Sequence, residues 1–138
     1  MEKIVNLNWL GKMAFKTTLD GHEIVVDAAP ENDGQDQGPR PKALMLVALA
    51  GCTGMDVVSI LKKMRVEPSG FNVKVVGDLT EEHPKHFDKM KIVYEFEGTN
   101  LEYDKLKKAI ELSMEKYCGV SAVYKKALTL DYEIIVKS

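Results

Sequence analysis

The beginning of the chain alternates apolar and polar residues with a period of two, which is typical of strands with one covered face. This alternation runs over Ile4–Leu10 and again over Met13–Leu19. Asp20-Gly21 is a two-residue hairpin signal that leads into a third apolar run, Glu23–Asp27. The pattern therefore predicts three consecutive antiparallel strands, followed by an exposed loop at Ala28–Gln37.

A long apolar helix is predicted next, within Gly38–Arg65. Pro41 suits the first helical position, because the N–H that a proline lacks would have no partner there. No charged residue occurs from Ala43 to Met55, whereas a helix that faces solvent carries polar residues on each turn. The run ends at Asp56, which makes it shorter than the roughly 20 apolar residues that span a bilayer. We therefore expect the helix to be covered on all sides, which in a small domain points to self-association.

Three further strands and two helices are predicted after this helix. The strands are expected at Phe71–Leu79, Lys89–Phe96 and Leu128–Val136. Tyr103–Tyr117 carries apolar residues at the i, i+3, i+4 spacing of an amphipathic helix, and a short helix is expected at Ala122–Ala127. The order of these elements predicts an α+β fold in which sheets wrap helices.

Composition narrows the class of protein. The length of 138 residues predicts a single domain, 1–138. A formal net charge of −2, from 19 basic and 21 acidic residues, argues against a nucleic-acid partner held through its phosphates. The start of the chain lacks a basic and apolar leader of the secretory type, so we expect a cytoplasmic location. Two cysteines are too few for a disulfide scaffold, and we expect any pairing between them to be transient and chemical.

The two cysteines are the candidate reactive groups. Cys52 lies within the apolar helix between Gly51 and Gly54, which either allow another backbone to pack closely or leave the sulfur accessible. Cys118 lies at a predicted helix break, with Ser121 as a candidate cap for the next helix. A sulfur at a helix N-terminus is favoured as the thiolate. An inert, packed cysteine remains the alternative interpretation at both positions.

Charged residues near Cys52 bear on its chemistry. Asp56 follows Cys52 by four residues and so lies on the same face of the helix. An ionised carboxylate so close disfavours a thiolate unless Lys12, Arg40 or a basic residue of a second chain neutralises it. His83 and His86 have a metal-like spacing, but they lie in a charged loop without further ligands, so no metal site is expected.

Three segments of the sequence resemble the OsmC/Ohr superfamily, most closely its YhfA-like branch. They are GPRPKALMLVALAGCTGMDVVSILKKMR, HPKHFDKMKIVYEFEG and EKYCGVSAVYKKA, and the likeness extends in matching order over essentially the whole chain. The resemblance implies an OsmC-like α+β fold, with antiparallel sheets wrapping two central helices in an intertwined homodimer. This agrees with an apolar helix that needs cover on every side.

The resemblance also implies an activity, the thiol-dependent reduction of organic hydroperoxides or hydrogen peroxide. Cys52 would be the peroxidatic cysteine, Cys118 the resolving one, and an external dithiol of the lipoyl type the reductant, with no bound cofactor. Peroxidases of the family carry an arginine on an early strand and a glutamate before the first cysteine. This chain has Lys12 in the corresponding early region and Lys42 before the cysteine.

Two other functions stay open at the level of sequence. The first is a redox-inactive protein that binds a small apolar or electrophilic ligand on the same scaffold, with Cys52 as part of the lining. The absent arginine and glutamate favour this alternative, whereas the presence of both cysteines favours the hydroperoxide reductase. The second is thiol–disulfide exchange with protein partners.

Overall fold

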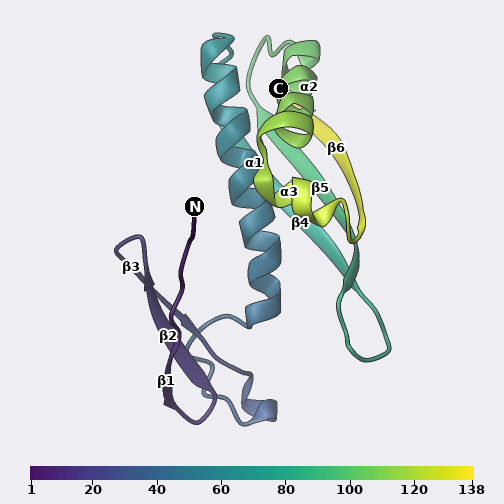
Figure 1. Cartoon of the computed structure of the whole chain (residues 1–138). Helices are drawn as coiled ribbons and strands as arrows, with labels where there is room; N and C mark the ends of the chain where they lie inside the picture. Colours follow the sequence, from purple (N-terminus) through teal and green to yellow (C-terminus); the bar gives the residue numbers. More distant parts are fainter. The chain divides into compact units, whose positions relative to one another are not determined.

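In the computed structural model, which describes residues 1–138, contacts divide the chain into two units, Met1–Met45 and Leu46–Ser138 (Figure 1). Each unit contains one three-stranded sheet, and the helices longer than one turn belong almost entirely to the second. The predicted α+β class is therefore confirmed. The assignment of 1–138 to a single domain stays a prediction.

The first unit is an antiparallel sheet in the order β1-β2-β3, as predicted. Its elements are β1 (Asn8–Gly11), β2 (Ala14–Leu19), β3 (His22–Val26) and a short 3₁₀ turn (Pro30–Asn32). Leu19 faces His22 across the Asp20-Gly21 turn, where both turn residues have positive φ angles, 52° and 80°. The hairpin signal was therefore correct. The first strand is shorter than expected, because Ile4–Leu7 lies outside it.

A buried carboxylate holds the predicted loop at Ala28–Gln37. The Asp27 side chain accepts hydrogen bonds from the backbone N–H groups of Ala28 (2.7 Å), Gln35 (3.2 Å) and Gln37 (3.1 Å). Burial acts to raise the pKa of Asp27, but these three hydrogen bonds and the nearby Arg40 charge lower it below its usual value. The ionised carboxylate therefore fixes the path of the loop.

The second unit contains the other sheet, in the order β4-β5-β6. Its elements after the long helix are β4 (Gly70–Leu79), β5 (Phe87–Glu97), α2 (Tyr103–Leu112), a π turn (Ser113–Tyr117), α3 (Gly119–Tyr124) and β6 (Thr129–Lys137). The predicted strands are confirmed to within two residues. β4 and β5 are antiparallel, as expected, but β5 and β6 are parallel, so the expectation of antiparallel sheets is wrong for this one pair. The helices between β5 and β6 return the chain to the end where β5 began, as a parallel pair requires.

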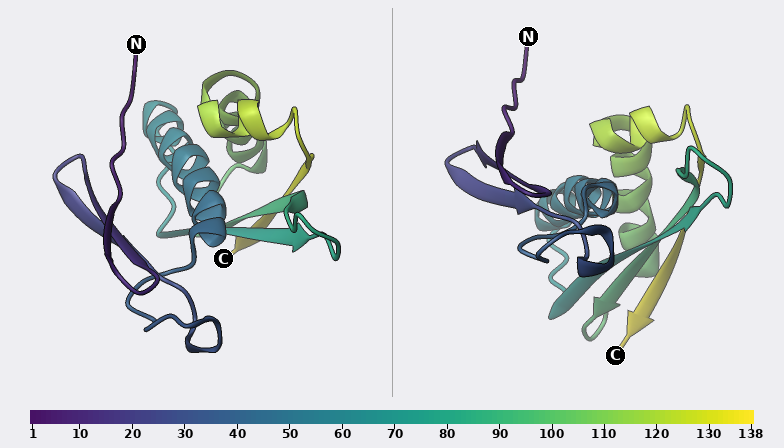
Figure 2. Two further views of the ribbon diagram at one scale, coloured as in Figure 1. Left: turned by 60° about the horizontal axis from the view of Figure 1, so that its bottom comes forward. Right: turned by 90° about the horizontal axis from the view of Figure 1, so that it is seen from below.

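The core of the second unit lies between the helices and one face of this sheet. Figure 2 shows α1 and α2 on the same side of the sheet. Fully buried side chains come from α1, β5 and α2: Leu49, Val57, Ile92, Tyr94, Phe96, Leu106 and Ile110. Along β5 every second residue from Met90 to Phe96 is buried, as expected for one face of a strand turned toward the helices, and Val93 on the other face is buried as well. This packing fixes α1 relative to the end of α2.

The long helix α1 (Leu44–Lys63) begins after a 3₁₀ turn at Pro41–Ala43, as the proline signal predicted. The chain alone leaves part of it uncovered, since Val47, Met55 and Val58 are 63%, 77% and 54% exposed, and cover by a second copy stays a prediction. Pro41–Lys63 is also long and apolar enough to cross a membrane, contrary to the argument from the uncharged run. This is weak evidence for a span, because the core helix of a soluble protein passes the same test.

Candidate functional site

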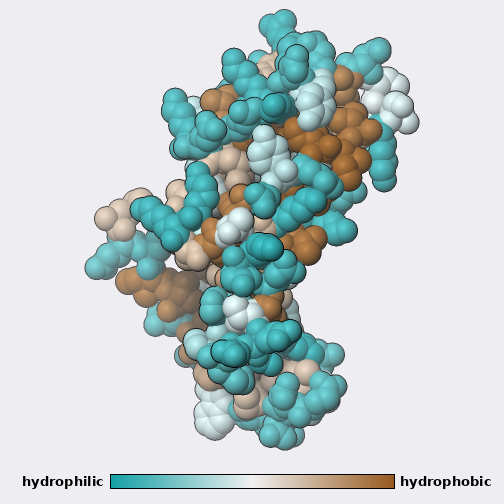
Figure 3. All heavy atoms as spheres, turned by 90° about the vertical axis from the view of Figure 1, so that its right-hand side faces the viewer, coloured by the Kyte–Doolittle hydropathy of each residue, from teal (hydrophilic) through white to brown (hydrophobic).

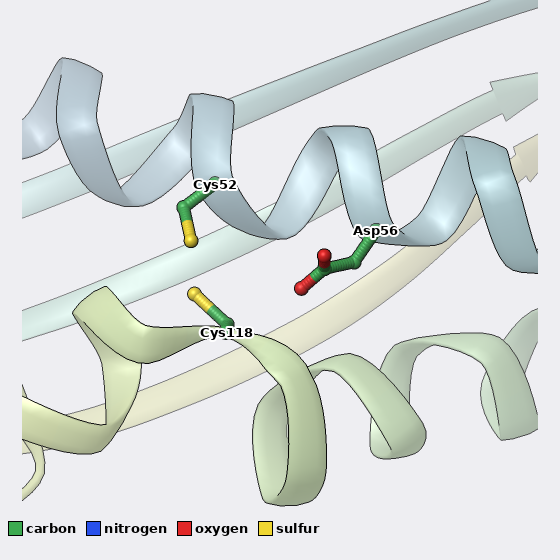
Figure 4. A group of neighbouring side chains, drawn as sticks. All are labelled: Cys52, Asp56 and Cys118. Atoms are coloured by element: carbon green, nitrogen blue, oxygen red, sulfur yellow. The ribbon is translucent and has the colours of Figure 1, made fainter.

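The fold brings the two cysteines and Asp56 together. Cys52 and Asp56 lie one turn apart on α1, and Cys118 lies between the π turn and α3. The two sulfurs and a carboxylate oxygen of Asp56 all lie within 4.8 Å of one another. Figure 4 shows the three side chains pointing toward a common centre. Both cysteines are free thiols, so the site is a dithiol with a carboxylate beside it.

The two sulfurs differ in exposure. Cys52 is partly exposed, whereas Cys118 is only 3% exposed. The glycines beside Cys52 also differ, because a Cβ on Gly54 would meet Val73 Cγ2 at 3.3 Å but a Cβ on Gly51 would meet nothing within 4 Å. Gly54 therefore serves close packing against β4, and Gly51 leaves space beside the helix. Access to the Cys52 sulfur past Gly51 stays a prediction.

Cys118, and not Ser121, is the N-cap of α3. The backbone N–H of Ser121 donates to Cys118 Sγ at 3.4 Å, while Ser121 Oγ donates to the carbonyl of Cys118 at 3.0 Å. The capping position makes α3 begin at Gly119, earlier than the predicted Ala122. Burial raises the pKa of the Cys118 thiol, the Ser121 N–H lowers it, and the neighbouring Cys52 raises it, so that the net shift is upward. The expectation that the helix start favours a thiolate at Cys118 is therefore wrong.

This upward shift predicts the pH dependence of alkylation at Cys118. Since the thiolate is the reactive form, alkylation of Cys118 by iodoacetamide is expected to need a higher pH than alkylation of an unperturbed thiol, whose pKa is about 8.5. Peptide mass mapping of wild-type protein, quenched at intervals over a pH series, measures this rate separately from that of Cys52. Half-maximal reactivity of Cys118 below pH 8 would contradict the assignment of a protonated, buried thiol.

A buried chain of hydrogen bonds fixes Asp56. Ser113 Oγ donates to Asp56 Oδ2 at 2.9 Å, and Thr53 Oγ1 lies 2.8 Å from Ser113 Oγ and 2.7 Å from the Tyr94 hydroxyl. The Ser113 proton is used on the carboxylate, so Thr53 must donate to Ser113 and Tyr94 must donate to Thr53. Every hydroxyl proton in this series of hydrogen bonds therefore points toward Asp56, which fixes the position of its carboxylate.

Thr53, Tyr94 and Ser113 are each 0% exposed, and sequence reasoning did not identify them as part of the site. Burial raises the pKa of Tyr94 to about 12, so this residue acts as a hydrogen-bond donor and not as a phenolate. One signal was present in the sequence. Ser113 falls on the apolar stripe of the amphipathic helix, seven residues after Leu106, where a polar residue calls for a buried partner.

The two predicted basic groups lie in the first unit. Lys12 has a positive φ angle of 52° in the turn between β1 and β2, and its carbonyl accepts a hydrogen bond from the Trp9 indole. Arg40 forms an ion pair with Asp36. Cys52, Cys118 and Asp56 belong to the second unit, so a supporting charge from Lys12 or Arg40 stays a prediction. His86 lies in the loop before β5, where its ring Nδ1 is 2.6 Å from the carbonyl of Pro84.

Comparisons with known proteins match this fold and chain length. A family model described as OsmC-like protein matches residues 34–133. Protein YhfA of Escherichia coli K12 is 34% identical over 134 residues, which cover 96% of this chain and 93% of YhfA. A hypothetical protein of Aquifex aeolicus superposes with a TM-score of 0.84 at 31% identity, covering 100% of this chain and 99% of its own.

An organic hydroperoxide resistance protein, OsmC, of Legionella pneumophila has the same fold. It superposes with a TM-score of 0.66 at 16% identity, and the match covers 100% of this chain and 98% of the other. The family match spans both cysteines, and the YhfA match spans nearly the entire chain. The expected family is thus confirmed: this chain belongs to the OsmC-like family.

Proposed function

We propose that the protein is a thiol peroxidase that reduces organic hydroperoxides or hydrogen peroxide through a disulfide between Cys52 and Cys118. The observation that supports this most is the approach of the two sulfurs, which lie within 4.8 Å although their residues are far apart in sequence. Their unequal exposure supports the division of roles. Cys52 is the sulfur that a dissolved peroxide can reach, and the buried Cys118 is held beside it.

The reaction has three steps. The Cys52 thiolate attacks the distal oxygen of the hydroperoxide and the O–O bond breaks. The alkoxide takes a proton and departs as the alcohol, and Cys52 becomes a sulfenic acid. The Cys118 sulfur then displaces the hydroxyl of the sulfenic acid, forming the S–S bond and releasing water. An external dithiol, of the lipoyl class in this proposal, exchanges with the disulfide and restores both thiols while it is itself oxidised.

The carboxylate of Asp56 imposes a requirement on this reaction. It lies within 4.8 Å of both sulfurs, and an attacking thiolate places a second negative charge beside it. We expect a positive charge from Lys12 or Arg40, of this chain or of a second copy, to offset it. The Legionella relative, which is named for organic hydroperoxide resistance, supports the class of substrate.

Consumption of cumene hydroperoxide tests the proposal directly. The reduced wild-type protein with a dithiol reductant is expected to consume it catalytically. Cys52→Ser is expected to fall to the rate of the reductant alone, because the other thiol of the chain, Cys118, is buried. Unchanged consumption by Cys52→Ser would rule the peroxidase out. If the wild type consumes nothing and its thiols stay reduced, the redox-inactive ligand-binding function is the better account.

We also propose that the protein is a homodimer that covers the exposed face of α1. Val47, Gly51, Met55 and Val58 lie on one stripe of the helix, at i, i+4, i+8 and i+11. The three large side chains are more than half exposed, and Gly51 lets another backbone approach. Figure 3 shows further hydrophobic side chains at the surface among hydrophilic ones. We propose that a second copy of the chain packs on this stripe. Cys52 lies at the edge of the stripe.

Introducing a charge on this stripe is expected to separate the dimer. The wild type should sediment at twice the chain mass of 15.4 kDa, and Val47→Glu should shift the equilibrium toward 15.4 kDa, because a buried unpaired carboxylate is costly. The matched control is Val76→Glu, on the solvent-facing side of β4, which should stay dimeric. A wild-type protein that sediments as a folded monomer would contradict the dimer.

A further inference from the structure

We propose that Cys52, Cys118 and Asp56 form a binding site for a divalent cation of the zinc class, and that the metal-bound and disulfide states exclude each other. The metal site itself does not depend on the proposed peroxidase. A bound metal would also prevent Cys52 from reducing peroxide, and only this consequence rests on the proposed function. The sequence pointed to no metal here, because only His83 and His86 showed a familiar ligand spacing.

The spacing of the ligand atoms fits a tetrahedral cation. With metal–sulfur bonds of about 2.3 Å and metal–oxygen bonds of about 2.1 Å, the ligand atoms of a tetrahedral zinc site lie about 3.6 to 3.8 Å apart. In this protein the two sulfurs and the carboxylate oxygen are separated by no more than 4.8 Å. A contraction of about 1.2 Å at most, within the range of side-chain rotation, brings all three to bonding distance.

The surrounding hydrogen bonds hold the ligands as a metal site requires. Asp56 uses one oxygen to accept the hydroxyl of Ser113, which leaves the other carboxylate lone pairs free to bind a cation. Cys118 Sγ accepts the backbone N–H of Ser121, which orients the sulfur. Ligands held by such outer partners are typical of protein metal sites, where removal of one partner weakens binding about 10- to 100-fold.

The chemistry of the ligands selects the metal. Two thiolates and one carboxylate favour zinc, cadmium or cobalt over magnesium or calcium, which prefer oxygen ligands alone. Three protein ligands leave a fourth position for water, the number found where zinc keeps an open coordination position. On binding, the cation replaces the protons of the two thiols, which pass to solvent, so the affinity increases with pH.

Metal binding and disulfide formation use the same electron pairs. When a two-electron oxidant acts on the metal-bound dithiolate, the two sulfurs lose two electrons and form the S–S bond, and the cation is released because a disulfide is a poor ligand. A hydroperoxide takes the two electrons and two protons from solvent and yields an alcohol and water. Diamide, an oxidant that contains an N=N bond, takes the same electrons and protons and yields a hydrazine. This reaction does not need peroxidase activity.

Competition with a chromophoric chelator for zinc, in anaerobic reduced protein, tests the site. We expect one zinc per chain, with binding at least about 100-fold weaker in Cys52→Ser or Cys118→Ser and about 10-fold weaker in Asp56→Asn and Ser113→Ala. Asp78→Asn, an exposed residue on β4, is the control and should bind as the wild type does. Circular dichroism and thermal melts establish that each variant folds.

Cadmium gives an independent readout, because thiolate-to-cadmium charge transfer absorbs in the ultraviolet. The band should appear at one equivalent in wild type and be reduced in either cysteine variant. An Asp56→Asn variant that binds both metals as tightly as the wild type would overturn the three-ligand site. Failure of the folded wild type to compete with the chelator at micromolar zinc would overturn it entirely.

Addition of one equivalent of diamide to the zinc-loaded protein tests mutual exclusion. Zinc should appear in solution in proportion to the disulfide formed. Zinc retained by a protein whose Cys52–Cys118 disulfide is complete would overturn the exclusion. A protein that binds zinc and releases it with diamide, but consumes no hydroperoxide, would refute the proposed function and leave the metal site standing.

Discussion

Replacing Cys118 with serine is expected to slow the steady-state reduction of cumene hydroperoxide by at least about 100-fold, since the resolving sulfur then has to come from solution. In the wild type the second sulfur is held within 4.8 Å of the first, so disulfide formation is intramolecular. The first oxidation of Cys52 does not use Cys118 as a nucleophile, and its rate should change by only a few fold. The variant should therefore accumulate the Cys52 sulfenic acid, which a dimedone adduct records by mass.

Single-turnover kinetics separate these two steps in the Cys118→Ser variant. A burst of one hydroperoxide per chain followed by slow turnover is the expected pattern. Cys118 is buried, so a thermal melt is needed to show that the variant folds. Full steady-state activity in a folded Cys118→Ser protein would mean that Cys52 works without a resolving partner, and the proposed disulfide cycle would be wrong.

The second large effect is expected from Thr53→Val, which should lower the free energy of unfolding by about 2 to 4 kcal/mol. Valine preserves the shape of the side chain but removes the hydroxyl, whose oxygen accepts from Tyr94 and whose O–H donates to Ser113. All three residues are 0% exposed, so water does not replace the lost partner. Each buried polar group left without a partner costs about 1 to 3 kcal/mol.

A double variant distinguishes the lost hydrogen bonds from a general packing defect. Adding Tyr94→Phe to Thr53→Val removes the unsatisfied hydroxyl, so the double variant should be more stable than the sum of the two single losses predicts. Urea denaturation under reducing conditions and at one protein concentration measures these differences. Thr129→Val, at an exposed position of β6, is the control and should change stability by no more than about 0.5 kcal/mol. Strict additivity would contradict the hydrogen-bond explanation.

Most of the secondary structure followed from local signals. The alternation of β2, the Asp20-Gly21 turn that leads into β3 and Pro41 at the start of the long helix all led to correct elements. One error was a missed local cap, and the other came from a pairing between strands far apart in sequence. Cys118 caps α3 and so moves its start to Gly119, and β6 pairs with β5 in parallel, a relation that the alternation of a single strand does not encode.

The residues of the candidate site could be predicted from the sequence, but their proximity in space could not. The apolar helix and the predicted helix break drew attention to Cys52 and Cys118, and the four-residue spacing placed Asp56 on the face of Cys52. That the sulfurs meet depends on the packing of α1 against the end of α2 over β5, which involves residues far apart in sequence. The pKa of Cys118 could not be inferred either, because it is set by burial and by Cys52.

Peptide mass mapping without reduction, after one equivalent of cumene hydroperoxide is added to the reduced protein, is the most direct test of the central claim. The account predicts a single new species in which the peptides containing Cys52 and Cys118 of one chain are joined by a disulfide, with a mass loss of two hydrogens. Recovery of Cys52 unmodified, or joined only to Cys52 of another chain, would contradict it.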